Sequence, residues 1–204
     1  MRSSSLRKPL ALAGTALAAV LLIAGGLLLW GSAYVHNTVH DQLAAQQIYF
    51  PPSSAFAHPT AGGEITPGMI PSVSQYAGQQ MLTGQQAEAY ADHFITVHVQ
   101  NMSGGKTYSQ LSAQALAQPG NTKLADQVNT VFRGEALRGM LLNAYGWWKV
   151  SQIIYIISLV SFGLGGLTLI ASAVFGLAPG RRHGPAFEAA PRAGTEGPTP
   201  AKVA

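Results

Sequence analysis

The chain has 204 residues, with 12 lysines and arginines, 8 aspartates and glutamates, and no cysteine. Only 10% of its residues are charged, against roughly 25% in an average soluble domain. The absence of cysteine excludes disulfides, thiolate metal sites and cysteine nucleophiles. Most of the basic residues lie near the two ends of the chain, and the middle is slightly acidic. We therefore expect no basic face for nucleic acid.

The first apolar segment covers residues 10–32 and predicts a transmembrane helix. It contains no charged side chain, and about 20 such residues cross the hydrocarbon layer of a bilayer. A cleaved signal peptide is the alternative, because basic residues precede the segment and Gly31-Ser32-Ala33 offers a weak cleavage site. The apolar stretch is longer than the roughly 7–15 residues of a signal peptide, which favours a retained anchor.

The second apolar segment covers residues 149–178 and predicts a second transmembrane helix. Neither segment contains an ionisable side chain at depth, so we expect no transporter or pump. Small residues four positions apart let helix backbones approach closely. Such spacing predicts packing surfaces and leaves open a homo-oligomer formed through the spans. The residues concerned are Gly14 and Ala18 in the first segment, and Ser161 and Gly165 in the second.

The charges at the two ends predict the orientation in a cell membrane. Arginine and lysine precede the first segment and follow the second, whereas the region between carries only Lys149 near a boundary. The positive-inside rule then makes residues 1–9 and 179–204 cytoplasmic tails, and the composition of the second tail predicts disorder. Aromatic rings prefer the membrane–water interface, and they mark the opposite ends of both segments. These aromatic residues are Trp30, Tyr34, Tyr145, Trp147 and Trp148.

Residues 33–148 form the predicted extracytoplasmic domain. No run of alternating β-branched residues suggests a sheet, so the predicted fold is all-α, with two transmembrane helices flanking a small helical domain. The first helix is expected to continue beyond Trp30 and to stop at Pro51-Pro52, because proline removes a backbone donor. Residues 53–80 are rich in Pro, Gly and Ser without periodicity, and they predict an extended loop.

Three further helices are expected after this loop. The first begins at Thr83, with Gln86 completing a capping box, and ends at 103–105. The second covers about 107–117 and ends at a Pro-Gly pair. The third begins at residue 121 or 122. Nothing breaks it before the second apolar segment, so we expect the two to be continuous.

Histidines and carboxylates form partial metal-site patterns. His36 and His40 are four residues apart, as are Glu88 and Asp92, with His93 adjacent. Imidazole and carboxylate at this spacing can supply part of a zinc or iron site. The sequence lacks a His-Glu-x-x-His motif, and it shows no Ser/His/Asp arrangement of recognisable spacing. We therefore favour solvated or interfacial histidines, and we assign no metal, cofactor or catalytic residue.

The segment 132–139 contains a candidate interaction site. Gly134 and Gly139 each cost helix stability of about 1 kcal/mol relative to alanine, so we expect them to approach a neighbouring helix closely. The plain interpretation is a packed helix with surface charges, including an i, i+3 pair of glutamate and arginine. The alternative is an arginine that binds a phosphate or carboxylate, for example in a lipid head group. The candidate residues are Arg133, Glu135, Arg138, Lys106 and Tyr108.

This region contains several short motifs, at residues 41–43, 48–51, 86–91, 106–109, 132–139 (FRGEALRG) and 142–147. They resemble motifs of an uncharacterised family of actinobacterial two-span membrane proteins. The resemblance spans nearly the whole predicted domain and implies the two-span topology. Some members of that family carry the automatic name aromatic ring-opening dioxygenase. The histidines here do not supply a set of iron ligands, so the resemblance implies no reaction.

The sequence favours a non-catalytic envelope protein whose outer helical domain binds a partner or a lipid. A ligand-sensing subunit is the first alternative, because sensors often place a domain between two spans. The cytoplasmic tail of 179–204 is too short for an output domain, so signalling would need another subunit. A metal-dependent enzyme built on the histidine and carboxylate pairs is the second alternative.

Overall fold

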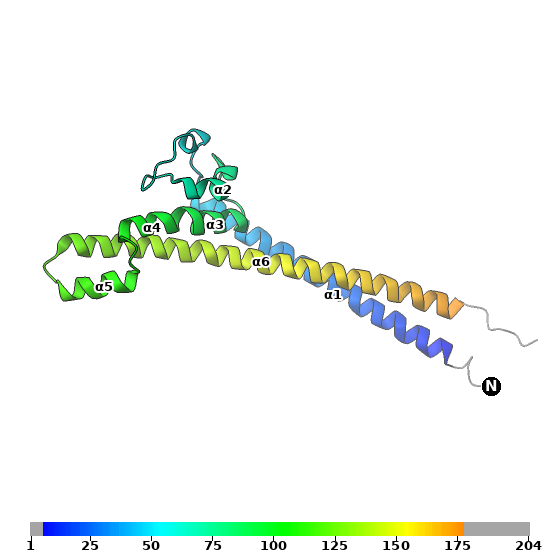
Figure 1. Cartoon of the computed structure of the whole chain (residues 1–204). Coiled ribbons are helices and arrows are strands. Elements are labelled where there is room, and N and C mark those ends of the chain that lie inside the picture. Colours follow the sequence, from blue (N-terminus) through cyan, green and yellow to red (C-terminus); the bar gives the residue numbers. More distant parts are fainter. Residues whose placement is uncertain (1–5, 178–204) are drawn as a thin grey trace, which may run out of the picture.

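Two long helices form the frame of the molecule in the computed structural model, which describes residues 6–177 (Figure 1). α1 (Arg7–Gln46) and α6 (Thr122–Leu177) run antiparallel, and the shorter helices gather at the end far from residues 7 and 177. Within the described range every regular element is helical, and an isolated bridge pairs Tyr49 with Gln80. The predicted all-α fold is therefore confirmed for this range. The tail at 179–204 lies outside the described residues.

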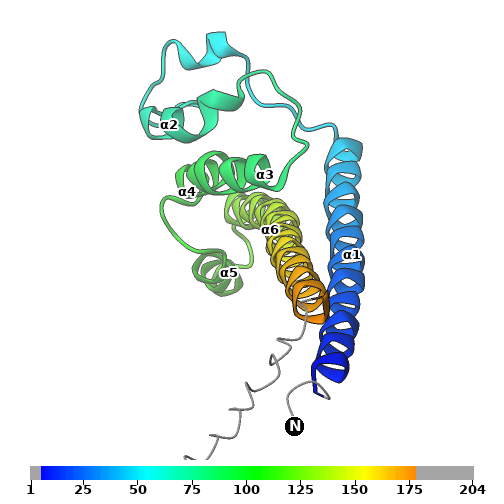
Figure 2. The ribbon, with the colours of Figure 1, turned by 90° about the vertical axis from the view of Figure 1, so that its right-hand side faces the viewer.

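Both long helices contain a stretch long enough and apolar enough to cross a membrane. α6 has 56 residues, which corresponds to a rod of about 84 Å at 1.5 Å per residue. It begins in the helical domain and continues through the second apolar segment without a break. The expected continuity of these two parts is confirmed. Figure 2 shows how the other helices lie around this rod.

Small residues at every seventh position hold α1 against α6. A seven-residue repeat keeps the same face of each helix toward its partner and is typical of left-handed helix pairing. Small side chains at the contact bring the backbones close. The small buried residues of this repeat are Ala18, Gly25 and Ser32 in α1, and Ser151, Ser158, Gly165 and Ser172 in α6.

Serine hydroxyls add hydrogen bonds across this interface. The Ser32 hydroxyl donates to the carbonyl oxygen of Ser151 over 2.8 Å, with both residues buried. The Ser161 hydroxyl donates to the Leu21 carbonyl oxygen over 3.1 Å. A hydroxyl surrounded by apolar atoms needs such a partner, because burying it unpaired is unfavourable. The two helices are thus joined by polar as well as van der Waals contacts.

The small residues expected on packing surfaces do pack, and their partner is the other long helix of the same chain. Ala18 is fully buried. A side chain added at Gly14 would meet Ser172, and one added at Gly165 would meet Leu22. These small residues therefore already contact the other long helix of the same chain. A homo-oligomer formed through the spans stays a prediction.

The shorter helices of the domain begin and end largely where local capping predicts. α3 (Gly84–Tyr90) starts with the expected capping box, in which the Thr83 hydroxyl accepts from the backbone N–H of Gln86. α5 (Tyr108–Ala117) has a second capping box at its start. α4 (Thr96–Ser103) ends at Gly104, whose φ of 60° lies in the left-handed region that favours glycine. Between α3 and α4, η4 (Ala91–Ile95) is a π-helical turn that the sequence did not predict.

The segment 53–80 is not an uninterrupted loop. It contains four short helices, each of only three or four residues, which explains why no helical periodicity is visible in the sequence. Ile65, Met69 and Val73 anchor the segment in the core, where all three are buried. The expectation of an extended loop was therefore too simple. The short helices are η1 (Ser53–Phe56), η2 (Pro67–Met69), α2 (Ile70–Val73) and η3 (Ser74–Tyr76).

α1 ends at Gln46, earlier than the expected stop at Pro51-Pro52. Gln47 adopts a left-handed conformation with a φ of 53°, and Tyr49 forms the isolated bridge with Gln80. The backbone N–H of Phe50 donates to Gln79, and that of Met81 donates to Ile48, each over 2.9 Å. Pairing with a distant segment therefore replaces the last helical turn.

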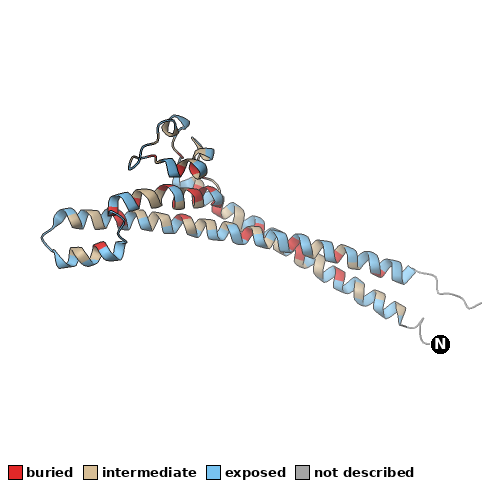
Figure 3. Cartoon of the chain, viewed as in Figure 1, coloured by how far each residue is buried: buried red, intermediate tan, exposed pale blue. Residues whose placement is uncertain are grey.

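The main core lies where this paired segment meets α3, η4 and α6 (Figure 3). Phe50 is 2% exposed, and its ring lies 5.2 Å from that of Tyr76 and 5.3 Å from that of Tyr90. Aromatic pairs at such distances are favourable beyond the area they bury. A smaller cluster of Val99, Leu111 and Val131 joins α4, α5 and α6.

The glycines of segment 132–139 have opposite environments. A Cβ at Gly134 would meet the Val99 side chain, whereas one at Gly139 would meet nothing within 4 Å. The expected close approach is confirmed at Gly134 and wrong at Gly139. We predict that Gly139→Ala raises the free energy of unfolding by about 1 kcal/mol through helix propensity. Gly134→Ala should instead lower it, because crowding a packed core costs about 1–3 kcal/mol.

These two substitutions control for each other, since they make the same chemical change in one helix. Denaturant unfolding of the detergent-purified variants measures the difference. Equal effects of the two substitutions would contradict the close contact between Gly134 and Val99.

Candidate functional site

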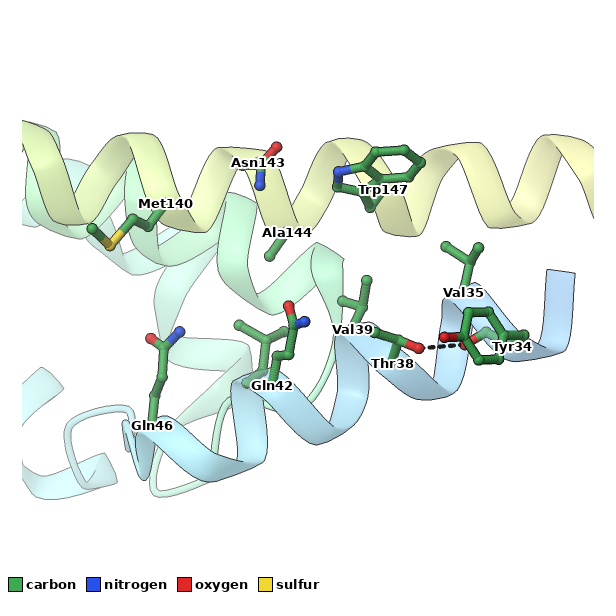
Figure 4. A pocket seen from close by; sticks show the side chains of 11 residues that line it. Tyr34, Val35, Thr38, Val39, Gln42, Gln46, Met140, Asn143, Ala144 and Trp147 are labelled. Atoms are coloured by element: carbon green, nitrogen blue, oxygen red, sulfur yellow. Dashed lines mark hydrogen bonds between the residues drawn. The ribbon is translucent and has the colours of Figure 1, made fainter. Parts of the chain in front are cut away.

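A groove between α1 and α6 lies beside the last turns of α1 (Figure 4). Its volume is about 490 Å³, which falls in the range of small-molecule sites. We call it the α1–α6 groove. Its lining residues are Tyr34, Val35, Thr38, Val39, Gln42, Leu43 and Gln46 from α1, and Met140, Asn143, Ala144 and Trp147 from α6.

Side-chain size explains why the two helices pack closely at one point and leave a groove beyond it. As far as Ser32 and Ser151 the buried residues of the two apolar segments are small. Beyond that point the buried α1 residues are Val39 and Leu43, which turn toward the domain core. Trp148 meets Gly84 at the start of α3, so α3 packs on α6 close to the groove.

The groove has an apolar base and an uncharged polar rim. Val35 and Ala144 contribute apolar surface, and Gln42, Gln46 and Asn143 contribute amides. None of the lining residues is Asp, Glu, Lys, Arg or His. These groups can make van der Waals contacts and neutral hydrogen bonds. They offer no carboxylate or imidazole for general acid–base chemistry.

Exposed aromatic rings mark the end of the groove nearest the apolar segments. Tyr34 is 63% exposed and Trp147 is 54% exposed. The Tyr34 ring stacks on Trp30, with 5.9 Å between the ring centroids. Large exposed apolar side chains gathered at one place are typical of an interaction surface. Figure 4 shows Tyr34 and Trp147 at one end of the groove, and Gln46 and Met140 at the other.

A second, more polar cavity of about 310 Å³ lies between α2–η3 and α3–η4. Glu88, Asp92 and His93, which the sequence grouped as partial metal ligands, all line it. A hydrogen bond with the Glu88 carboxylate raises the pKa of the Tyr145 phenol. The π-helical turn places Asp92 toward α6, where it meets Arg138.

Arg138 is held by carboxylates of its own chain. Its guanidinium lies 3.0 Å from the Asp92 carboxylate and 3.7 Å from that of Glu135. The Arg138 and Asp92 side chains are 33% and 38% exposed, so solvent screens their attraction. The structure thus uses Arg138 to attach η4 to α6. Binding of an external phosphate by this arginine stays a prediction.

We predict a modest coupling between Arg138 and Asp92. A double-mutant cycle with Arg138→Met and Asp92→Asn should give about 0.5–1 kcal/mol, because the pair is partly exposed. Thermal unfolding of the wild-type protein, the two single variants and the double variant, all purified in detergent, measures this coupling energy. Added salt should reduce the coupling energy. A coupling energy of zero at low salt would show that the pair does not hold η4 on α6.

Two further candidate interaction residues, Lys106 and Tyr108, lie at the start of α5. The Lys106 ammonium donates to the Gln114 side-chain oxygen over 2.9 Å. The Tyr108 ring lies 5.5 Å from that of Phe132 and helps to pack α5 on α6. Arg133 is exposed on α6. The contacts of Lys106 and Tyr108 thus differ from those of Arg138 and Glu135, and a shared role for the five residues stays a prediction.

No three His, Asp or Glu side chains within residues 6–177 are grouped so that they could hold a metal ion. His36 lines a small cavity between α1 and α6, and His40 lies 3.1 Å from the Asp41 carboxylate beside it. Glu88 and Asp92 are engaged with Tyr145 and Arg138. The metal-enzyme alternative therefore gains no support from the described part of the chain.

Comparisons of the chain with protein-family models, with curated proteins and with solved structures found no match. The resemblance to actinobacterial two-span proteins stays a prediction. The function is therefore argued from the site alone.

Sequence reasoning did not find the α1–α6 groove. It identified Tyr34 and Trp147 as aromatic residues of the membrane interface. These two residues were the only sequence feature that pointed toward the groove. The two walls lie about 100 residues apart in the chain, so their juxtaposition depends on the antiparallel pairing of α1 and α6. The uncharged residues of the rim carry no recognisable motif.

Proposed function

We propose that this chain is a non-catalytic membrane protein with two spans and that its outer helical domain binds a lipid or a protein partner in the α1–α6 groove. The single observation that carries the proposal is the position of the groove. An uncharged, partly apolar cavity opens where two long apolar helices meet the helical domain. A site there is accessible both from a membrane and from the water beside it.

The proposed orientation places both termini in the cytoplasm. Its support is the pattern of basic residues before the first apolar segment and after the second. The antiparallel arrangement of α1 and α6 brings residues 7 and 177 to one side, as this orientation requires (Figure 1). The seven-residue packing repeat also supports retention of the first segment, because its removal would expose the facing small residues of α6.

The ligand-sensing alternative has one supporting observation. α6 is a single helix from the domain through the second apolar segment, so a change at the groove can be transmitted along a rigid element. Binding is still the first step of such a mechanism. The proposed binding site is the same in both cases.

Single-cysteine labelling tests the orientation, and the natural chain has no cysteine to interfere. We expect a membrane-impermeant maleimide to label Gln118→Cys in intact cells, because Gln118 is exposed between α5 and α6. Thr195→Cys should be labelled only after permeabilisation. The reverse pattern would invert the proposed topology.

Protection of the groove tests the binding function. Gln42 lines the groove, whereas Ala45 is exposed on the same helix and does not line it. In native membranes Gln42→Cys should react several-fold more slowly with maleimide than Ala45→Cys. The two rates should become similar after extraction in detergent, which strips an occupant. Equal rates in native membranes would contradict the proposed function.

A further inference from the structure

We infer that the occupant of the α1–α6 groove is the acyl chain of a single lipid whose head group carries no net charge. This inference rests on the proposed function and names the class of ligand for the same groove. Three properties of the groove support it: its lack of charge, its elongated form and its connection to the apolar surface of the long helices.

The lack of charge disfavours occupants with a net charge. No lining residue carries a charge, so the groove offers no counter-charge to a group with a net charge, whereas a zwitterionic head group carries its own. An anionic head group, or a peptide with charged side chains, is therefore disfavoured. The amides of Gln42, Gln46 and Asn143 can instead donate to and accept from neutral oxygens.

The form of the groove suits a chain-like ligand. Its α1 wall extends from Tyr34 to Gln46, which is about 18 Å along a helix at 1.5 Å per residue. Val35, Val39 and Leu43 recur along this wall at helical spacing. Val39 and Leu43 are 5% and 1% exposed and pack in the domain core, so Val35 offers most of the apolar surface of this stripe. An extended hydrocarbon chain can contact Val35 on this wall and Met140 and Ala144 on the other, because hydrophobic contact has no directional requirement.

The connection to the apolar segments favours a lipid over a protein occupant. Tyr34 and Trp147 at one end of the groove are both exposed, and the neighbouring Trp30 and Val150 are 69% and 40% exposed. These residues connect the groove to the exposed apolar surface of α1 and α6. An acyl chain can therefore enter directly from a bilayer without crossing water.

Photo-crosslinking with the full-length protein tests this inference. A diazirine analogue of methionine replaces Met140, which lines the groove and is 64% exposed. The same analogue at Met102, which is 41% exposed and lies outside the groove, is the matched control. Each protein is irradiated in native membranes, and then in vesicles of phosphatidylcholine, phosphatidylglycerol and diacylglycerol in equal parts. Mass spectrometry identifies the adducts.

We expect lipid adducts at position 140 that exceed those at position 102 at least several-fold. In the mixed vesicles, diacylglycerol and phosphatidylcholine should dominate over anionic phosphatidylglycerol. Gln42→Trp, which fills the groove, should abolish the adduct at 140. Ala45→Trp on the same helix should leave it unchanged.

The other outcomes distinguish failure of the lipid inference from failure of the proposed binding function. A polypeptide adduct at 140 without lipid overturns the inference and leaves the proposed function standing. Preferential capture of phosphatidylglycerol overturns the uncharged head group. No adduct of either kind at 140, or equal lipid adducts at 140 and 102, overturns both the inference and the proposed binding in this groove.

Discussion

Phe50→Ala should open the helical domain while leaving the two long helices paired. Phe50 is buried and contacts two aromatic rings, and truncating such a residue typically costs about 3–5 kcal/mol. The loss should appear first where Phe50 holds the segment after α1 to residues 79–81. The hydrogen bond from the Met81 backbone N–H to Ile48 reports on this pairing.

Hydrogen exchange of the detergent-purified protein measures this effect. Protection of the Met81 amide should fall roughly 100-fold or more, since each 1.4 kcal/mol is a factor of ten. Amides of α6 beyond residue 150 should keep their protection, because their packing partner is α1. Tyr49→Ala is the control, as Tyr49 is the adjacent residue and is 57% exposed. A similar loss of protection in both variants would show that Phe50 does not anchor the core.

Gly165→Leu should force α1 and α6 apart within their apolar segments. A Cβ at Gly165 would lie 3.0 Å from Leu22 and 3.3 Å from Leu21, and leucine adds three further carbons. Overpacking of this kind typically costs about 1–3 kcal/mol. No hydrophobic gain offsets this overpacking cost in a bilayer, because the lipid tails that leucine would otherwise contact are as apolar as leucine itself.

Disulfide trapping measures this separation. Gly14→Cys and Ser172→Cys place two thiols in contact, because a side chain at position 14 would meet Ser172. The disulfide should form readily in this otherwise cysteine-free chain, and its yield should fall several-fold when Gly165→Leu is added. Gly163→Leu is the control, since a Cβ there meets nothing within 4 Å. An unchanged yield with Gly165→Leu would contradict the interface described above.

Local rules predicted most helix boundaries in the domain. The capping box at Thr83 and Gln86 and the glycine stop after Ser103 depend on neighbouring residues, so a single sequence reveals them. The end of α1 and the short helices of 53–80 depend on contacts with distant residues. Phe50 pairs with Gln79, and Met69 and Val73 are buried in the core. Residue spacing contains no record of such contacts.

The candidate site likewise combines features that the local sequence predicts with features that depend on distant contacts. Sequence reasoning singled out Arg138 and Asp92 separately, and their pairing over 3.0 Å required the fold. It expected close approach at both Gly134 and Gly139, because both weaken a helix. Only the position of Val99 decides that the contact is at Gly134.

By itself, the sequence determined the helical class, the two apolar segments and the continuity of the last helix, because length, hydropathy and helix capping act locally. The tertiary structure alone decided which small residues face each other and where the α1–α6 groove lies. Packing partners such as Ser32 and Ser151 are 119 positions apart. Their contact follows from shape complementarity over two whole helices, which no short stretch of sequence encodes.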